Sequence, residues 1–338
     1  MINEKIENLY GLRCPKTDGW VDNLFFSLVD YKNNYFTSKC INDLEAFYNS
    51  FSDVRELIEW MKERPKGIPY ITEVCGRTDI VIVIPTSDLK GEFALNCRDS
   101  IYPGMQIIFI ESGAKEDFYF NFAHYVNVGM KRALDYDPKW IVFSSDDMFK
   151  IDDVNVLIGN LQGLDNKALD VVFTKPSKYH SIPVYYSKSK LTRIIAFKLI
   201  KKRRVQLKIE NKFGRQYFSN PKRVFWRLFF KIGYEHLSIS DFGIFSTEFV
   251  KKKNGSIFDE TYVNSSEDVD LSMELTIDHN KITIIDYRIG DLIGKTLGKS
   301  PYRHIKDIAG EAYLEAKVRH RVHPASYLIS KQTTEKDF

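Results

Sequence analysis

The residues best suited to chemistry are acidic and fall in two short clusters. The first is Asp146-Asp147, which follows the apolar run 140–143 after Ser144 and Ser145. Two adjacent carboxylates leaving a buried strand can hold a hard divalent cation such as Mg²⁺ or Mn²⁺, because these ions prefer oxygen ligands. The same pair could instead cap a helix or lie in a solvated turn. The strand in front of the pair favours the metal.

The second acidic cluster lies in residues 258–271, FDETYVNSSEDVDL. Its carboxylates alternate with aromatic residues, and Glu267 and Asp268 are predicted to open a helix. Carboxylates are favourable there because the helix dipole is positive at its N-terminus. They could serve only to cap that helix. A carboxylate facing a hydroxyl acceptor could also act as a general base.

The elements expected to position these clusters alternate between strands and helices, which predicts βαβ units and a doubly wound, mostly parallel α/β sheet. The predicted strands are 80–85, 105–110, 140–143, 169–174, 242–245 and 282–285. The predicted helices are 118–134, 152–161, 267–279 and 302–320. Ligands of open α/β sheets bind outside the carboxyl ends of the strands. We therefore expect Asp146 and Asp147 to lie at a ligand site.

Five motifs, taken in order, resemble those of family 2 glycosyltransferases of the GT-A fold. The motifs are Val83–Asp88 with its Pro-Thr turn, Glu111 at the end of the second strand, Phe122-Ala123 followed by Asn127-Val128-Gly129, Ser145-Asp146-Asp147, and Phe258–Leu271. The resemblance covers about residues 79–290. Each motif alone is weak, and their order and spacing make the resemblance specific.

The resemblance implies a Rossmann-like GT-A domain, a nucleotide-sugar donor, a divalent metal (Mg²⁺ or Mn²⁺) and inversion at the anomeric carbon. It implies that Asp268 is the base that deprotonates the acceptor and that Glu267 orients Asp268 or the acceptor. The implied metal ligands are Asp147 and Asp146, of which Asp146 could contact the ribose instead. The implied donor contacts are Pro85, Thr86, Ser87, Glu111, Asn127 and Asp146.

Three positions depart from the family pattern. Ser145 stands at the first acidic position of the metal motif, so more of the metal binding is expected to rest on Asp147. Asn121 replaces the glycine before the Phe-Ala pair. Asp291 lies where many relatives have a metal-binding histidine, and it is either a third metal ligand or a turn residue.

The chain of 338 residues is expected to divide into three parts. Residues 1–75 form a predicted N-terminal helical extension, in which Asp53 and Glu56 resemble a capping box. Residues 76–300 form the catalytic domain, with a basic insertion at about 180–238. Residues 301–338 form a C-terminal helix and tail.

The basic insertion holds most of the positive charge. Between Tyr186 and Gly233 there are 15 Lys and Arg and one acid, Glu210, a net charge of +14 in a chain whose total is +4. Basic residues mixed with Trp and Phe are typical of a segment lying on an anionic membrane, which would suit a lipid-linked or glycan acceptor. A solvated basic face is the main alternative, and a nucleic-acid surface is less favoured.

The composition also limits the kinds of protein that this chain could be. No apolar run is long enough to span a bilayer, and the start of the chain lacks the apolar core of a signal peptide. The four cysteines form no CxxC pair, which disfavours a thiol-rich zinc site. We therefore expect a cytoplasmic enzyme bound peripherally to the membrane. The competing class is a GT-A-like module that binds a membrane or nucleic acid without turnover.

Overall fold

The computed structural model describes residues 48–111, 120–174, 239, 241–277, 280–292, 309–310, 312–314 and 316–317, without the side chains of 273, 276, 277 and 291. The basic insertion and most of the predicted N-terminal extension lie outside these residues. Within the described part of the chain, no helix is long and apolar enough to cross a membrane.

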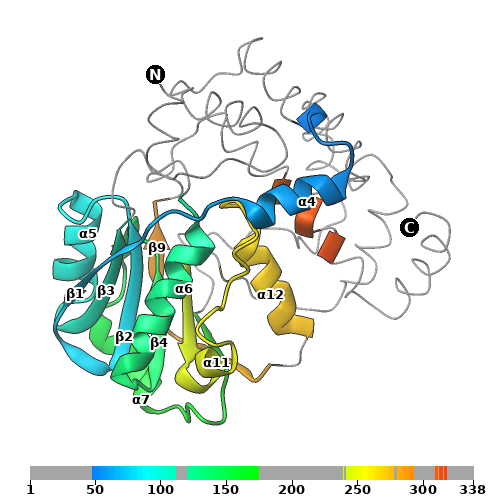
Figure 1. Cartoon of the computed structure of the whole chain (residues 1–338). Helices are drawn as coiled ribbons and strands as arrows, with labels where there is room; N and C mark the ends of the chain where they lie inside the picture. The colour runs from blue at the N-terminus through cyan, green and yellow to red at the C-terminus, as the bar shows by residue number, and fades with distance from the viewer. Residues whose placement is uncertain are drawn as a thin grey trace, which may run out of the picture.

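A seven-stranded sheet forms the centre of the described fold, in the order β1-β3-β2-β4-β7-β6-β8 (Figure 1). Its strands are β1 (Tyr70–Val74), β2 (Arg77–Thr86), β3 (Met105–Glu111), β4 (Trp140–Ser144), β6 (Val171–Thr174), β7 (Phe242–Ser246) and β8 (Ile282–Ile285). A separate two-stranded ribbon pairs β5 (Met148–Lys150) with β9 (Ile289–Asp291). The six strands predicted from the sequence are all present.

The sheet is mixed, with a parallel core. Strands β3, β2 and β4 pair in parallel, as do β6 and β8, whereas β7 runs antiparallel to both β4 and β6. The antiparallel strand β1 adds an edge beside β3. Sequence analysis assigned no strand to residues 70–74, which it placed in the N-terminal extension. Because the first three residues of β1 are exposed, this strand lacks the continuous apolar run of a buried strand.

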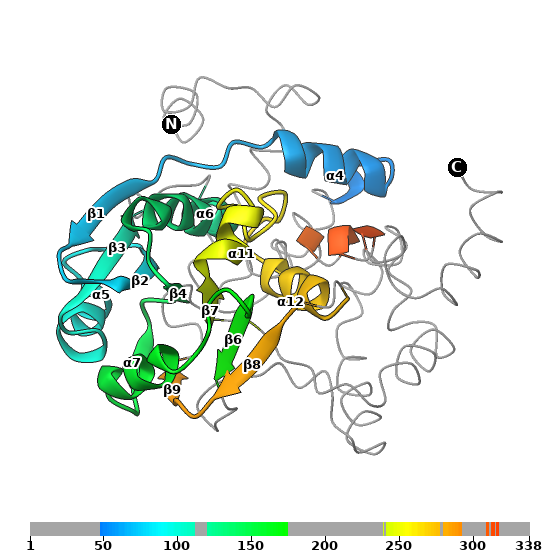
Figure 2. The same cartoon turned by 90° about the horizontal axis from the view of Figure 1, so that it is seen from below.

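Both faces of the sheet are covered, as the sequence predicted. Along β2, Ile80, Ile82 and Ile84 point to one apolar cluster, and Val81 and Val83 point to the other. The first cluster includes residues of α5 (Glu92–Asn96), the π-helical turn η1 (Cys97–Ile101) and α7 (Val154–Gln162). The second includes residues of α6 (Phe122–Ala133), α11 (Thr247–Lys252) and α12 (Glu267–Ile277). Figure 2 shows the sheet between these two layers.

The predicted cap at Asp53 is confirmed. Helix α4 (Val54–Glu63) begins after Asp53, whose carboxylate accepts hydrogen bonds from the backbone of Arg55 and Glu56. The Glu56 carboxylate in turn accepts a hydrogen bond from the Ser52 backbone at 2.6 Å. The Asp53 carboxylate thus satisfies two backbone donors of the first helical turn, while Glu56 bonds Ser52 and not the backbone of the cap residue, as a complete capping box would require.

Candidate active site

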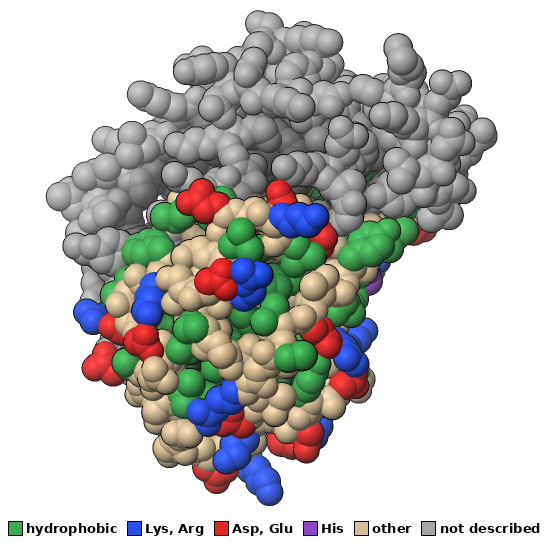
Figure 3. Space-filling view, turned by 90° about the vertical axis from the view of Figure 1, so that its left-hand side faces the viewer, with side chains coloured by type: hydrophobic (Ala, Val, Ile, Leu, Met, Phe, Trp, Pro, Cys, Tyr) green, Lys and Arg blue, Asp and Glu red, His purple; other side chains and the backbone are tan. Residues whose placement is uncertain are grey.

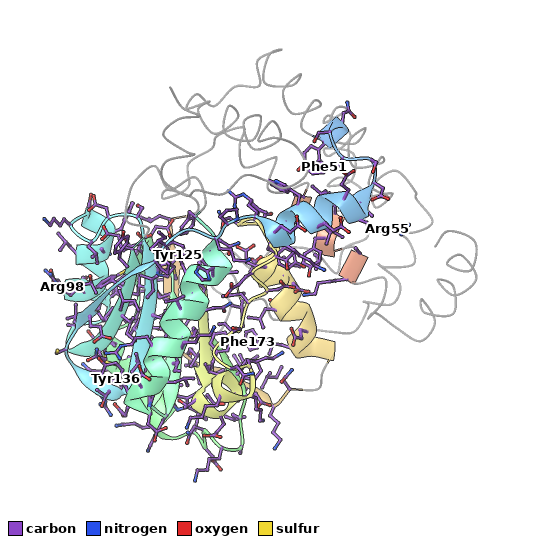
Figure 4. The ribbon with its side chains drawn as sticks, in the orientation of Figure 1. Phe51, Arg55, Arg98, Tyr125, Tyr136 and Phe173 are labelled. Carbon is purple, nitrogen blue, oxygen red and sulfur yellow. The ribbon has the colours of Figure 1, made fainter. Side chains whose placement is uncertain are left out.

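The candidate site lies at the edge of the sheet where the parallel core strands end. Thr86, Glu111 and Ser144 are the last residues of β2, β3 and β4, and Asp146 and Asp147 follow Ser144 after the single residue Ser145. Helix α6 follows β3 and packs on β2 and β3, so its N-terminus returns to this edge. Tyr125 and Tyr136, labelled in Figure 4, mark the start and the far end of this helical segment.

Asp146 is fixed from two sides. It is 5% exposed, and its Oδ2 accepts a hydrogen bond of 2.8 Å from Oγ1 of Thr86 at the end of β2. Its backbone carbonyl accepts a hydrogen bond from Sγ of Cys97, the first residue of η1, at 3.3 Å. The hydroxyl of Tyr102, directly after η1, donates to Oγ of Ser144 at 2.8 Å. The η1 turn therefore supports the Asp146-Asp147 turn from the α5 side of the sheet.

Asp147 is a mostly buried residue beside Asp146. The residue is 7% exposed, and among the described residues its carboxylate accepts no hydrogen bond and forms no ion pair. Its backbone carbonyl accepts a hydrogen bond from the Leu292 backbone at 3.0 Å. Two adjacent carboxylates, one of them without a described partner, offer the oxygen ligands that hard divalent cations prefer, so the residues present fit such an ion.

The backbone of Asp291 lies beside the same turn. Asp291 in β9 is paired with Met148 in β5, and Asp147 is the residue directly before Met148. The Asp291 backbone is therefore close to Asp147. Its side chain is outside the described set, so its predicted role as a third ligand stays a prediction. Among the described side chains, no group of three or more His, Cys, Asp or Glu is placed to hold a metal ion.

The residues predicted to contact the donor occupy different environments. Pro85 and Thr86 are buried at the end of β2, whereas Ser87 is exposed just beyond it. Glu111 is partly exposed, and its Oε1 accepts a hydrogen bond from the Leu89 backbone at 3.2 Å. Glu111 thus ties the end of β3 to the loop that follows β2. These positions share the edge on which Asp146 lies.

Asn127, which the resemblance implied as a donor contact, is engaged by its own protein in this structure, and its contact with a donor stays a prediction. It is fully buried in α6, and its Oδ1 accepts a hydrogen bond from the Phe258 backbone at 3.0 Å. Its Nδ2 donates to the Phe258 carbonyl at 2.9 Å and to Oε1 of Glu260 at 3.0 Å. Asn121, at the start of the same helix, donates to the carbonyls of Glu260 and Tyr262. In this structure the two asparagines hold the loop of the second acidic cluster against α6.

Most carboxylates of the second acidic cluster have partners. Oε2 of Glu260 lies 3.0 Å from Nδ1 of His124, and this contact, with Asn127, lowers the pKa of Glu260 despite its burial. Burial raises the pKa of Asp259, but hydrogen bonds from Lys317 at 2.7 Å and from Thr261, together with the charge of Lys317, outweigh burial and leave the pKa lowered. Lys317 also pairs with Asp270. Glu260 and Asp259 are therefore held as anions by neighbouring donors, and Asp270 is paired with Lys317.

Asp268 differs from these neighbours. It lies in the first turn of α12, and the hydrogen bond that its carboxylate accepts comes from the Val269 backbone at 2.8 Å. No cation pairs with it among the described residues. The residue is partly exposed, yet enough protein surrounds the carboxylate that burial raises its pKa to about 6. A carboxylate with this pKa is suited to general base catalysis near neutral pH. Glu267, beside it, is 7% exposed.

A short segment connects the two acidic clusters. The carbonyl of Asp241 accepts a hydrogen bond from the Ser145 backbone at 2.8 Å. Two residues earlier, the Ile239 backbone donates to Oγ of Ser272, which itself donates to the Asp268 carbonyl at 2.6 Å. Ile239 and Asp241 are two residues apart, and two residues of extended chain span at most about 7 Å. The metal cluster is bonded to one end of this short segment and the helix of the predicted base to the other, so the two clusters lie near each other.

Sequence analysis did not select Asp241. The residue precedes the apolar run 242–245, and a residue that enters a strand is normally expected at the opposite edge from the carboxyl ends. Because β7 is antiparallel to β4, Asp241 lies at the same edge as Asp146. Only the direction of β7 could have revealed this.

No protein-family model matches the chain, and no curated protein matches it. Among solved structures the chain is similar to the mannosyltransferase PcManGT from Pyrobaculum calidifontis in complex with GDP-Man and Mn²⁺. The TM-score is 0.36 at 11% sequence identity, and the match covers 93% of this chain and 91% of that chain. The likeness is distant, and membership of family 2 stays a prediction.

Proposed function

We propose that this protein is an inverting glycosyltransferase that moves a sugar from a nucleotide-sugar donor to a hydroxyl acceptor. The observation that carries the proposal is the Asp146-Asp147 turn at the carboxyl edge of the parallel core, where Asp147 is 7% exposed and its carboxylate has no described partner. The position suits a ligand of an α/β sheet. The family motifs quoted above supply the reaction class.

The metal is proposed to be Mg²⁺ or Mn²⁺, held by Asp147 with Asp146. Mg²⁺ is usually bound through one or two carboxylates together with substrate phosphates, so two protein ligands are sufficient. When bound, the cation would neutralise the charge that develops on the departing diphosphate. Thr86 keeps Oδ2 of Asp146 in place. Asp291 is retained as the proposed third ligand because its backbone adjoins Asp147.

Asp268 is proposed to accept the proton of the acceptor hydroxyl. Its pKa of about 6 leaves it mainly ionised at neutral pH while keeping it basic enough to take up a proton. Glu267 precedes it on α12 and is proposed to orient Asp268 or the acceptor. The pairing of Asp259, Glu260 and Asp270 with Lys317 and His124 supports the choice of Asp268 among the acids of this cluster.

The donor is proposed to lie along Pro85, Thr86, Ser87, Glu111 and Asp146, which share the carboxyl edge. Glu111 is proposed to meet the nucleobase. We assign Asn127 the positioning of the Phe258–Glu260 loop, because its amide group is engaged there. A lipid-linked or glycan acceptor is proposed from the basic insertion alone.

Turnover with a panel of nucleotide sugars, in the presence of Mn²⁺ or Mg²⁺, tests the proposal. We expect one donor to raise the melting temperature and to be hydrolysed or transferred, since a ligand that binds the native state stabilises it. Asp147→Ala should abolish turnover and weaken metal-dependent nucleotide binding. NMR of the product should show an inverted anomer.

Full activity in Asp147→Ala would move the metal site elsewhere. Binding of membranes or nucleic acid, with no turnover of any donor, would favour the module without catalytic activity.

A further inference from the structure

Ser145 is the residue at which the metal motif of this chain lacks a carboxylate. In the structure its hydroxyl faces Asp241, with 3.5 Å between Oγ of Ser145 and Oδ1 of Asp241. Its backbone N–H donates to the carbonyl of the same residue at 2.8 Å. The residue that replaces the missing acid is thus in direct contact with an acid from another strand.

The register of the sheet explains this contact. Ser144 is paired with Phe242 across the antiparallel β4–β7 ladder, and the next pair outward is Ser145 with Asp241. Residues directly opposite each other in antiparallel strands have Cβ atoms roughly 4.5–5.5 Å apart. A carboxylate at position 241 therefore lies one side chain away from a carboxylate at position 145.

We propose that Asp241 supplies the negative charge that Ser145 cannot, acting across the Ser145 hydroxyl on the cation held by Asp146 and Asp147. This inference rests on the proposed function. Asp241 is assigned as a positioning residue and not as a direct metal ligand. The assignment therefore agrees with the finding that no three described His, Cys, Asp or Glu side chains are grouped to hold a metal ion. The separate indication that a cation belongs here is Asp147, a residue only 7% exposed whose carboxylate has no described partner.

The test is Mn²⁺ binding to the full chain, measured by electron paramagnetic resonance of free Mn²⁺ without any donor sugar. Asp241→Asn should weaken Mn²⁺ binding by about 10- to 100-fold, the usual effect of removing a residue that supports metal ligands. Asp241→Asn combined with Ser145→Asp should restore most of the affinity, because the charge moves across one pair of the ladder.

Glu248→Gln is the matched control, since it removes one exposed charge from α11, at the opposite edge of the sheet. It should leave Mn²⁺ affinity unchanged. Melting temperatures of all variants establish that they are folded.

Two results would overturn the proposal. One is that Asp241→Asn binds Mn²⁺ as tightly as the wild type while Asp147→Ala binds Mn²⁺ weakly. In that case the role of Asp241 is wrong, but the proposed function is not contradicted. The other is a folded double variant that stays as weak as Asp241→Asn, which would make Asp241 a structural residue only. If Asp147→Ala also binds Mn²⁺ normally, the proposed metal site itself is wrong.

Discussion

At the scale of single residues, carboxylates in one loop differ because their neighbours differ. Asp259 lies against Lys317 and Tyr313, which come from the C-terminal part of the chain, and its pKa is lowered. The Asp268 carboxylate accepts a hydrogen bond from the Val269 backbone and is otherwise surrounded by protein. This burial raises its pKa to about 6. The first environment stabilises the ionised form, and the second makes ionisation costly. Opposite effects on stability are expected when each charge is removed.

Asp268→Asn should lower the rate at least about 100-fold, the low end for a general base, with little change in donor binding. It should also stabilise the protein at pH 7. The folded-state pKa of about 6 lies above the ordinary value of 3.8, so ionisation of Asp268 disfavours folding at pH 7. The gain in the free energy of unfolding should shrink as the pH falls from 6 to 4. Denaturant unfolding at several pH values measures it.

Asp259→Asn is the matched control within the same acidic cluster. Its lowered pKa means that ionised Asp259 stabilises the fold above about pH 4, so the variant should be less stable at pH 7 by about 1–3 kcal/mol. This deficit should fade only below about pH 4. If Asp268→Asn is destabilised in the same way as Asp259→Asn, Asp268 is a structural residue and not the base.

At the scale of elements, the close approach of α6 to the sheet places its N-terminal asparagines against the second acidic cluster. A Cβ built at Gly129 would lie 2.4 Å from Cγ1 of Val83 and 3.0 Å from Cγ1 of Ile110. The glycine therefore permits α6 to contact β2 and β3 directly. At the far end of α6, Tyr136 donates a hydrogen bond of 2.6 Å to Glu73 of β1. Contacts at both ends fix the helix.

Gly129→Ala should destabilise the protein by about 1–3 kcal/mol, because overpacking outweighs the gain of about 1 kcal/mol in helix propensity. It should also impair turnover, because Asn121 and Asn127 would move with the helix. Gly159→Ala on α7 is the control, since a Cβ there meets nothing within 4 Å and the residue is exposed. That variant should gain up to about 1 kcal/mol. Thermal and denaturant unfolding compare the two. If Gly129→Ala and Gly159→Ala changed the free energy of unfolding equally, the contact of α6 with the sheet would not depend on the glycine.

At the scale of the whole molecule, charge is distributed unevenly along the chain. Outside the stretch from Tyr186 to Gly233 the net charge is −10, against +14 within it. On the face of the described domain seen in Figure 3, acidic and basic side chains are interspersed, with no single sign dominating. An anionic membrane would therefore attract the basic insertion far more strongly than this face.

Lys201, Lys202, Arg203 and Arg204 changed together to Gln should release much of the protein from anionic liposomes. Each cation near an anionic surface contributes about 1 kcal/mol, so four account for roughly a thousandfold in partitioning. Wild-type binding should weaken with salt, and neutral liposomes should bind poorly. Co-sedimentation measures this. The control changes four exposed lysines of the described domain, Lys62, Lys90, Lys167 and Lys281, to Gln. Equal pelleting with anionic and neutral vesicles would contradict membrane binding.

The sequence by itself determined the parts of the fold that have a local signature. Continuous apolar runs such as 80–84 predicted strands buried on both faces, and Asp53 with Glu56 predicted the start of a helix. The acidic pair after Phe143 was expected at the carboxyl edge and is found there. These features are readable because a few neighbouring residues decide them.

Only the tertiary structure decided which residues surround the site. The exposed edge strand β1 and the antiparallel direction of β7, which brings Asp241 beside Ser145, have no local signature. Lys317 pairs with Asp259 and Asp270 from 58 and 47 residues away. The distinction between these acids and Asp268 depends on burial and on partners from other elements. A pKa set by long-range contacts cannot be read from neighbouring residues, because folding alone brings its causes together.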